Sequence, residues 1–337
     1  MTARTTASHP RRPVHTPGAP AHVPEGPAHG PEGPAHGPEG PAHGPEGPAH
    51  GPEGPARTPA GRPRTSGGRA RVAPSVRALA RAALAAHPIS LEDVRERAEL
   101  LDRYDRCYLV PAADFLDIAA RLTDPHRDEP FRALSIGGRR WFGYHSVYYD
   151  TPELRAYHDH RQGRRRRCKI RERLYQDTGE RQFEIKVKGG RGQTLKFRRR
   201  LADRAHALED ASRSFLTRTL AEVYGTGFEA PQELTPSLVT DYTRATFVAD
   251  GQRVTADAAL VCRDAAGNEV YSARDLVLVE TKSYGHLTEA DLLLHEYGHR
   301  AAEFTKYASL AALDPSLPAH RWLRSLREAF PAAVAAG

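Results

Sequence analysis

The chain of 337 residues has a formal net charge of +7 and an isoelectric point near 9.4, a balance that indicates an anionic partner such as nucleic acid, a phosphate compound or a membrane surface. Its cysteines, Cys107, Cys168 and Cys262, are odd in number and widely spaced, which argues against a disulfide framework and a structural zinc site. No apolar run could cross a bilayer and no signal-peptide core is present, so a cytoplasmic protein without a membrane span is expected.

Residues 1–73 are expected to form a disordered tail. From Pro24 the heptapeptide PEGPAHG repeats four times, and a partial copy follows at residues 52–56. Proline and glycine fill most positions and apolar side chains are nearly absent, so the tail cannot bury enough surface to offset its conformational entropy. Its histidines could bind metal or titrate near about pH 6.5. A solvated spacer is the simpler interpretation.

The rest of the chain alternates between helical and strand-like patterns. Residues 74–98 predict a helical lead-in, in which a second short helix begins at the N-cap candidate Ser90. Further helices are expected at 114–122, 208–224, 288–313 and within the C-terminal segment 314–337. Strands rich in β-branched and aromatic residues are expected at 103–110, 143–150, 238–248, 252–260 and 275–282.

Three segments between residues 165 and 200 place a charged residue, nearly always a cation, at every second position. Such residues share one face of a β-strand. In the middle segment the opposite face is Phe183, Ile185 and Val187, which can pack on a core. A solvated sheet face would explain one such strand. Repetition over three strands favours the interior of a closed antiparallel barrel that meets a polyanion. The alternating residues are Arg165, Arg167, Lys169, Arg171, Arg173, then Glu184, Lys186, Lys188, then Lys196, Arg198 and Arg200.

Glu280 and Lys282 are two residues apart on a predicted strand, so they point the same way. A carboxylate among inward cations is costly to bury unless it is ion-paired or holds a divalent metal. Phosphoryl transfer uses both arrangements, because arginines, lysines and Mg²⁺ or Mn²⁺ stabilise the charge spread over the phosphate oxygens. A simple ion pair with Lys282 is the alternative.

The sequence His295, Glu296 and His299 matches the zinc-peptidase pattern H-E-x-x-H on a predicted helix. No third ligand follows at a convincing spacing, so a chance match is preferred and a zinc metallopeptidase is a remote alternative. The common nucleotide-binding and hydrolase motifs are absent. Aromatic residues do not interleave with the cationic strands, so nucleic acid is not an expected partner.

The order of these segments resembles the VTC domain, the polyphosphate polymerase branch of the CYTH-like triphosphate tunnel metalloenzymes. The resemblance covers about residues 100–313 and is carried by RYDRCYLVP, HSVYYDTPEL, KIRERLY, FEIKVK, LKFRRR, PSLVTDYTR, RVTAD, LVLVETK and FTKYASL. It implies an α+β fold, an antiparallel β-barrel tunnel with flanking helices over residues 99–313. It also implies that ATP or another triphosphate binds with Mn²⁺ or Mg²⁺ and that the terminal phosphate passes to a polyphosphate chain.

The resemblance also implies roles for individual residues. By position, the catalytic residues are Lys169, Arg171, Arg173, Lys282 and Lys306. The phosphate-binding residues are Arg167, Lys186, Lys188, Lys196, Arg198 and Arg244. Glu280 resembles the metal ligand of the family, and Asp105 is a weaker candidate.

Three positions depart from the family pattern. Asp105 and Cys107 stand where the first strand usually has glutamate and lysine, and His145 stands where arginine is common. Arg103 could compensate for the lost cation, whereas Arg106 should face the opposite way. These changes leave two alternatives to the polymerase: a tripolyphosphate or nucleoside triphosphate hydrolase that uses the same site, and a non-catalytic polyphosphate-binding module.

Overall fold

The computed structural model describes residues 72–98, 102–203 and 205–334. The tail expected at residues 1–73 therefore lies outside the described residues, apart from its last two. Eight strands form a barrel: β2 (Asp102–Pro111), β4 (Trp141–Asp150), β5 (Cys168–Tyr175), β6 (Arg181–Lys188), β7 (Thr194–Leu201), β8 (Thr235–Ala249), β9 (Gln252–Arg263) and β11 (Leu276–Ser283). Three shorter strands join the same sheet: β1 (Pro88–Ile89), β3 (Arg132–Leu134) and β10 (Glu269–Tyr271).

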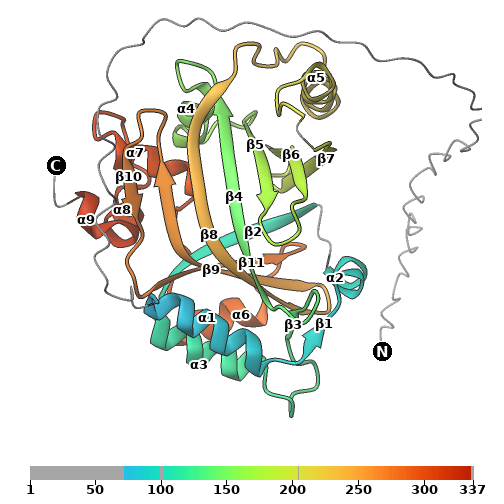
Figure 1. Ribbon diagram of the computed structural model, residues 1–337, viewed down its shortest axis with the longest axis vertical. Coiled ribbons are helices and arrows are strands. Elements are labelled where there is room, and N and C mark those ends of the chain that lie inside the picture. Colours follow the sequence, from blue (N-terminus) through green and yellow to red (C-terminus); the bar gives the residue numbers. More distant parts are fainter. Residues whose placement is uncertain (1–71, 99–101, 204, 335–337) are drawn as a thin grey trace, which may run out of the picture. The chain divides into compact units, whose positions relative to one another are not determined.

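The barrel closes in the order β8-β4-β5-β6-β7-β2-β11-β9, and β9 pairs back to β8. Every pairing around this ring is antiparallel, so the fold predicted from the sequence is confirmed (Figure 1). The seam between β7 and β2 is short, because only Leu195 and Thr194 pair with Asp102 and Arg103. Among the described strands, β7 has no partner on that side beyond Leu195.

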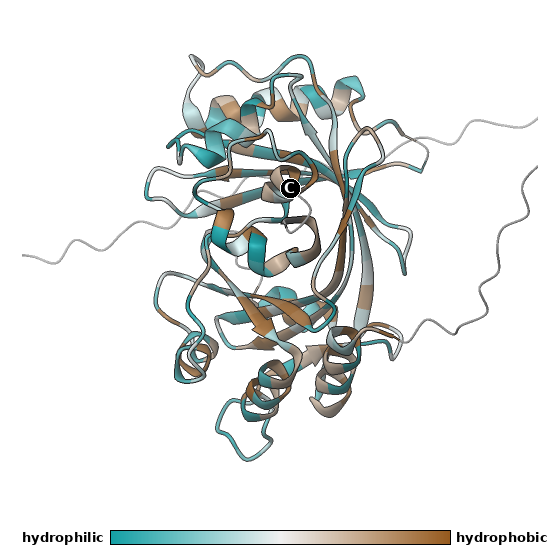
Figure 2. Ribbon diagram, turned by 90° about the vertical axis from the view of Figure 1, so that its left-hand side faces the viewer, coloured by the Kyte–Doolittle hydropathy of each residue, from teal (hydrophilic) through white to brown (hydrophobic). Residues whose placement is uncertain are grey.

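Helices cover the outside of the barrel: α1 (Pro74–Ala85), α2 (Leu91–Ala98), α3 (Ala112–Leu122), α4 (Arg155–Arg161), α5 (Asp210–Tyr224), α6 (Glu289–Glu296), α7 (Leu310–Leu313), α8 (Leu323–Ala329) and α9 (Pro331–Val334). The strand face with Phe183 and Ile185 packs with Leu216 and Leu220 of α5, as the alternation predicts. A second core joins α1, α3 and α6 to the other side of the barrel. Along several strands the ribbon in Figure 2 changes between hydrophilic and hydrophobic, as expected for a sheet with one polar face and one packed face.

The prediction of one helix over residues 288–313 is wrong in the middle of that range, where the chain is not helical. Thr288 caps α6 through a capping box, but the helix ends at Glu296, and Gly298 adopts a φ of +83° that favours glycine. Residues 297–305 then leave the helix, and the amide of Ala302 donates to the carbonyl of Cys107 at 2.7 Å. This bond to β2 replaces helical hydrogen bonding. Only the 3₁₀ turn η1 (Lys306–Ser309) and the short α7 follow.

The sequence analysis also missed α4, β1, β3 and β10, each of which has seven residues or fewer. The buried carboxylate of Asp150 holds the first turn of α4, because it accepts the amides of Ala156 at 2.8 Å and Tyr157 at 3.0 Å. In the described part of the chain, no helix combines the length and apolar character needed to span a bilayer.

Candidate functional site

The barrel encloses a cavity of about 740 Å³ whose wall is dominated by positive charge. Sixteen arginines and lysines line it, against six aspartates and glutamates. The cationic strands therefore face inward rather than bulk solvent, although Arg165 and Arg200 lie outside the wall. All of the predicted site residues line the cavity: Asp105, Arg167, Lys169, Arg171, Arg173, Lys186, Lys188, Lys196, Arg198, Arg244, Glu280, Lys282 and Lys306.

Strands β5, β6 and β7 arrange their inward side chains in rows across the wall. Directly opposite residues of antiparallel strands have Cβ atoms about 4.5–5.5 Å apart, close enough for like charges to repel. Successive rows are about 6.7 Å apart along the strands, twice the rise per residue. The rows are Lys169-Lys186-Lys196, Arg171-Glu184-Arg198 and Arg173-Gln182; Arg200 pairs with Gln182 in register but lies outside the wall.

Glu184 is the counter-ion at the centre of these rows. Its side chain is fully buried, and it accepts a hydrogen bond from Nε of Arg171 at 2.7 Å. Lys196 also pairs with it, and Nη1 of Arg173 lies 3.8 Å away. Burial opposes its ionised form, yet these cations hold the pKa of Glu184 well below its usual range. The sequence analysis gave Glu184 no role, although it was the one acid within the alternating cations.

All three lysines of the first row lose much of their basicity in this setting, and burial lowers the pKa of Lys186 well below its ordinary value. Burial, together with the charges of Lys188 and Arg171, lowers the pKa of Lys169 to about 7. Burial also lowers the pKa of Lys196 to about 7, despite the attraction of Glu184. The Nζ of Lys169 donates to Oγ1 of Thr305 at 2.8 Å, so the segment after α6 contacts the same row.

Asp257 of β9 joins two predicted cations that come from different elements. Its carboxylate accepts both Nε and Nη2 of Arg244, at 2.5 and 2.7 Å, and it also pairs with Lys306 of η1. Burial opposes the charge on Lys306, but Asp257 raises the pKa of the lysine above its ordinary value. The lysine Nζ lies 4.5 Å from the centroid of the Tyr242 ring. The sequence analysis assigned Asp257 no role.

Glu280 and Lys282 form the ion pair that was the alternative to a metal site, with Oε2 and Nζ 2.7 Å apart. Lys282 also donates to Oγ1 of Thr255 at 2.8 Å. On the neighbouring strand, Asp105 pairs with Nε of Arg103 at 2.6 Å. Arg103 therefore lies in the wall, where it adds a cation next to Asp105. Burial opposes ionisation of Glu280, but Lys282 and other cavity lysines keep the pKa of Glu280 well below its usual range.

The donor set at Glu280 suits a divalent cation that arrives with phosphate. Glu280 and Asp105 lie close enough to interact electrostatically, and both line the cavity. Within the described residues there is no cluster of three or more His, Cys, Asp or Glu side chains that could hold a metal. Mg²⁺ commonly uses one or two carboxylates and takes its other ligands from water and substrate phosphates. The residues therefore fit a substrate-borne metal better than a protein-only cage.

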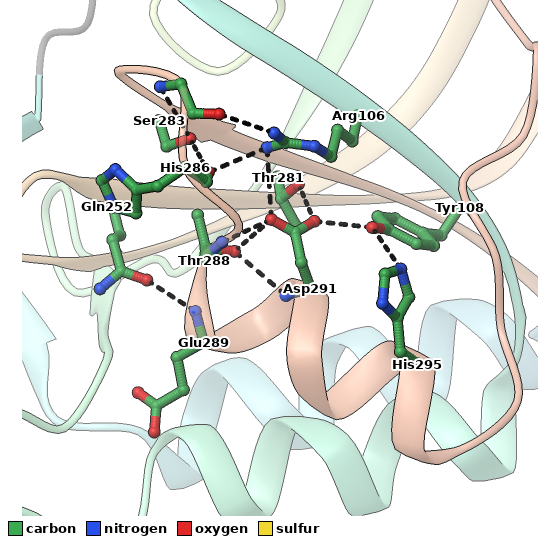
Figure 3. A network of polar contacts seen from close by, with 11 residues as sticks. Arg106, Tyr108, Gln252, Thr281, Ser283, His286, Thr288, Glu289, Asp291 and His295 are labelled. Carbon is green, nitrogen blue, oxygen red and sulfur yellow. Dashed lines mark hydrogen bonds and ion pairs between the residues drawn. The ribbon is translucent and has the colours of Figure 1, made fainter.

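A polar network on the outer side of the barrel centres on Asp291 of α6 (Figure 3). The fully buried carboxylate of Asp291 accepts the hydroxyl of Tyr108 at 2.7 Å and the hydroxyl of Thr281 at 2.6 Å. Arg106 borders the cavity, but its guanidinium approaches the same carboxylate at 3.4 Å, on the outer side of the barrel as predicted. Asp291 thus ties α6 to β2 and β11 at the level where Glu280 pairs with Cys107.

The H-E-x-x-H match does not form a zinc-peptidase site. His299 lies beyond the end of α6, and its Nε2 is 2.9 Å from a carboxylate oxygen of Asp114. His295 contacts Tyr108 at 3.4 Å (Figure 3), and Glu296 pairs with Arg121. The two histidines therefore contact different partners rather than a common centre.

The remaining departures from the family pattern have different consequences. Cys107 lines the cavity, and burial raises the pKa of its thiol to about 12, so the side chain is neutral and a tunnel charge is absent. His145 lies outside the wall, with Nδ1 2.8 Å from a carboxylate oxygen of Asp241. The substitution at His145 therefore removes no cavity residue.

Residues 102–313 match the family model of the VTC domain. The chain belongs to the VTC domain family. The cation-lined wall of the closed barrel agrees with the tunnel that the resemblance to this family implies. Residues 314–334 lie beyond the match, yet Arg321 and Trp322 from this segment also line the cavity.

No curated protein matches the VTC-domain chain. Solved structures similar to it include a putative adenylate cyclase from Vibrio parahaemolyticus, with 16% identity, coverage of 58% of this chain and 82% of that one, and a TM-score of 0.27. A putative adenylyl cyclase from Hippeastrum, described as having a dominant triphosphatase activity, shows 12% identity, coverage of 63% and 95%, and a TM-score of 0.32. The RNA triphosphatase Pct1 of S. pombe shows 12% identity, coverage of 55% and 57%, and a TM-score of 0.22. Likenesses this weak have no bearing on function.

Proposed function

We propose that this VTC domain is a metal-dependent polyphosphate polymerase, which transfers the γ-phosphate of ATP to a polyphosphate chain inside the tunnel. The observation that carries the proposal is the length of the cationic track. Arg167 and Lys188 extend the three rows at the end where β5 begins. From Arg167 to Arg173 the chain advances about 20 Å at the rise of a β-strand, a length that suits an extended polyanion.

In the proposed reaction, a terminal oxygen of the polyphosphate attacks the γ-phosphorus of ATP. A new P–O bond forms, the bond between the γ-phosphorus and its bridging oxygen breaks, and ADP leaves. Lys169, Arg171, Arg173 and Lys306 would neutralise the charge on the phosphoryl oxygens. Lys186, Lys188, Lys196, Arg198 and Arg244 would hold the neighbouring phosphates, and Lys282 would orient Glu280. Glu280, with Asp105 beside it, would hold Mn²⁺ or Mg²⁺, which when bound would supply positive charge that stabilises the reacting phosphate.

Hydrolysis is the second candidate, and the β7–β2 seam favours it. Beyond the two paired residues of that seam, the inward side chain of Arg198 is exposed, so water can reach the second row. Water that reaches the γ-phosphorus would compete with the polyphosphate oxygen. A tripolyphosphatase or nucleoside triphosphatase would use the same cations.

The experiment is incubation of the purified protein with ATP and Mn²⁺, followed by gel resolution of the products. Long chains support the polymerase, free phosphate supports the hydrolase, and neither product with tight tripolyphosphate binding supports a binding module. The Glu280→Ala variant serves as the metal-site control. Activity that needs zinc and His295 would overturn the proposal.

A further inference from the structure

Every lysine of the chain lies in the wall of the cavity. The sequence holds 49 lysines and arginines together, and only six of them are lysines. Outside the wall, every member of this pair is an arginine. A guanidinium stays charged in proteins, whereas a lysine amine can lose its proton and then act as a nucleophile. The chain therefore concentrates its reactive side-chain amines in the cavity, at Lys169, Lys186, Lys188, Lys196, Lys282 and Lys306.

The lysines differ in the groups that hold their amines. Three of them form an ion pair with a carboxylate: Lys196, Lys282 and Lys306. A carboxylate favours the ammonium form, in which nitrogen has no lone pair to react. No ion pair joins Lys169 to a carboxylate of the described residues. Its Nζ instead donates to the hydroxyl oxygen of Thr305 at 2.8 Å, which fixes the position of the amine without adding a negative charge.

The charges that act on Lys169 are mostly positive. Burial is the main cause that lowers its pKa to about 7, and the cations Lys188, Arg171 and Arg167 add to it. Glu280 acts in the opposite direction, with a smaller effect than these causes. A desolvated lysine beside other cations is an activated amine nucleophile. Lys169 therefore has the surroundings of a reactive group.

Small anions can reach this amine. Lys169 is half-buried and lines the cavity of about 740 Å³, so a molecule inside the cavity can contact it. Arg167 and Arg171 lie two residues to either side on the same strand face and line the same wall. Guanidinium groups bind phosphate through paired hydrogen bonds. A molecule that carries both a phosphate and an electrophilic carbon would thus be held with that carbon near the amine.

We propose that Lys169 is a site of covalent acylation by acyl phosphates, small molecules in which a carbonyl carbon is joined to a phosphate. The arginines hold the phosphate while the neutral amine attacks the carbonyl carbon. A C–N bond forms, the C–O bond to the phosphate breaks, inorganic phosphate leaves with the bonding electron pair, and the amine proton passes to solvent. The amide product is neutral, so the first row loses a positive charge. Acylation does not require the polymerase activity, and only its effect on a bound polyanion is linked to the proposed function.

The test is treatment of the purified protein with acetyl phosphate at pH 8, followed by digestion and mass spectrometry of each lysine. Lys282 and Lys306 are internal controls, because they line the same cavity and are ion-paired. At pH 8 an amine with a pKa of about 7 is about 90% neutral, against about 0.3% for an ordinary lysine. We expect Lys169 to be acetylated at least about fivefold faster than either control, and excess tripolyphosphate to slow its acetylation.

The effect of acetylation is measured by isothermal titration with tripolyphosphate in buffer that contains EDTA, where turnover is not expected. Treated wild-type protein should bind at least about fivefold more weakly than untreated protein, because a cation is lost from the row. The matched variant is Lys169→Arg, which keeps a positive charge and cannot form the amide. The same treatment should leave the affinity of this variant equal to its own untreated value.

Absence of acetylation at Lys169, or equal acetylation of Lys282 and Lys306, would overturn the proposal and leave the proposed function standing. A loss of affinity in treated Lys169→Arg as large as in the wild type would also overturn it, because the effect would then come from another group. If Lys169 is acetylated but the untreated protein does not bind tripolyphosphate, the acylation site stands and the proposed function fails.

Discussion

Burial in the tunnel wall brings the pKa of two lysines close to neutral pH. The pKa of Lys169 and that of Lys196 are both about 7, against an ordinary value of 10.5. This difference corresponds to about 5 kcal/mol for each lysine at 1.36 kcal/mol per pH unit. Burial is the main cause, and neighbouring cations add to it at Lys169. A bound phosphate would supply the missing negative charge and restore the ammonium form.

We therefore predict that tripolyphosphate binding takes up protons. At pH 8 a group with a pKa of about 7 is only about 10% protonated, so Lys169 and Lys196 together should take up nearly two protons, and Lys186, whose pKa burial lowers well below its ordinary value, adds to this uptake. Because binding favours the protonated lysines, the affinity for tripolyphosphate should fall as the pH rises from 7 to 9. The loss should reach about tenfold per pH unit for each proton taken up.

The assay is titration calorimetry at pH 8 in buffers of different ionisation enthalpy, with tripolyphosphate as the ligand. The slope of the observed enthalpy against the buffer enthalpy gives the number of protons. Lys169→Arg keeps a charge that does not titrate in this range, so it should reduce the uptake by about one proton while binding persists. Tight binding by the wild type with an uptake near zero at pH 8 would refute the reasoning, because it would mean that these lysines are already charged in the empty tunnel.

Three further predictions concern carboxylates. Glu184→Gln removes the counter-ion of Arg171 and Lys196 and should destabilise the protein by about 3–5 kcal/mol. Tripolyphosphate should raise the Tm of this variant more than that of the wild type, and a Tm equal to that of the wild type without ligand would contradict the counter-ion role of Glu184. Glu280→Ala should lose about a hundredfold or more in ATP turnover while it keeps tripolyphosphate affinity within about threefold, since the metal stabilises the reacting phosphoryl group; unchanged turnover in a product assay would exclude Glu280 as the metal ligand. Asp291→Asn should lower the free energy of unfolding by about 1–3 kcal/mol in chemical denaturation, because it leaves buried hydroxyl donors poorly paired; a wild-type midpoint would show that the network in Figure 3 adds no stability.

The helix predicted over residues 288–313 shows why local patterns failed at one place. Residues 297–305 carry no strong helix breaker except Gly298, so the sequence alone favours continuation. The backbone of Ala302 instead bonds to the carbonyl of Cys107, on a strand nearly two hundred residues earlier. That contact brings Thr305 and Lys306 to the cavity. The same break in the helix separates the two histidines of the H-E-x-x-H match.

The sequence by itself determined which side chains share a face. A strand turns residues i and i+2 to the same side, so the cations of β5, β6 and β7 had to lie together in any fold that kept these strands. The apolar residues opposite, Phe183, Ile185 and Val187, required a cover on the other face, and α5 supplies it.

Only the tertiary structure decided which carboxylate meets which cation. Asp257, Arg244 and Lys306 come from three elements that meet when the barrel closes. The lowered basicity of Lys169 and Lys196 likewise depends on burial by distant segments. The physical reason is that alternation is a local property of the backbone, whereas charge pairing and desolvation depend on residues that are far apart in the chain.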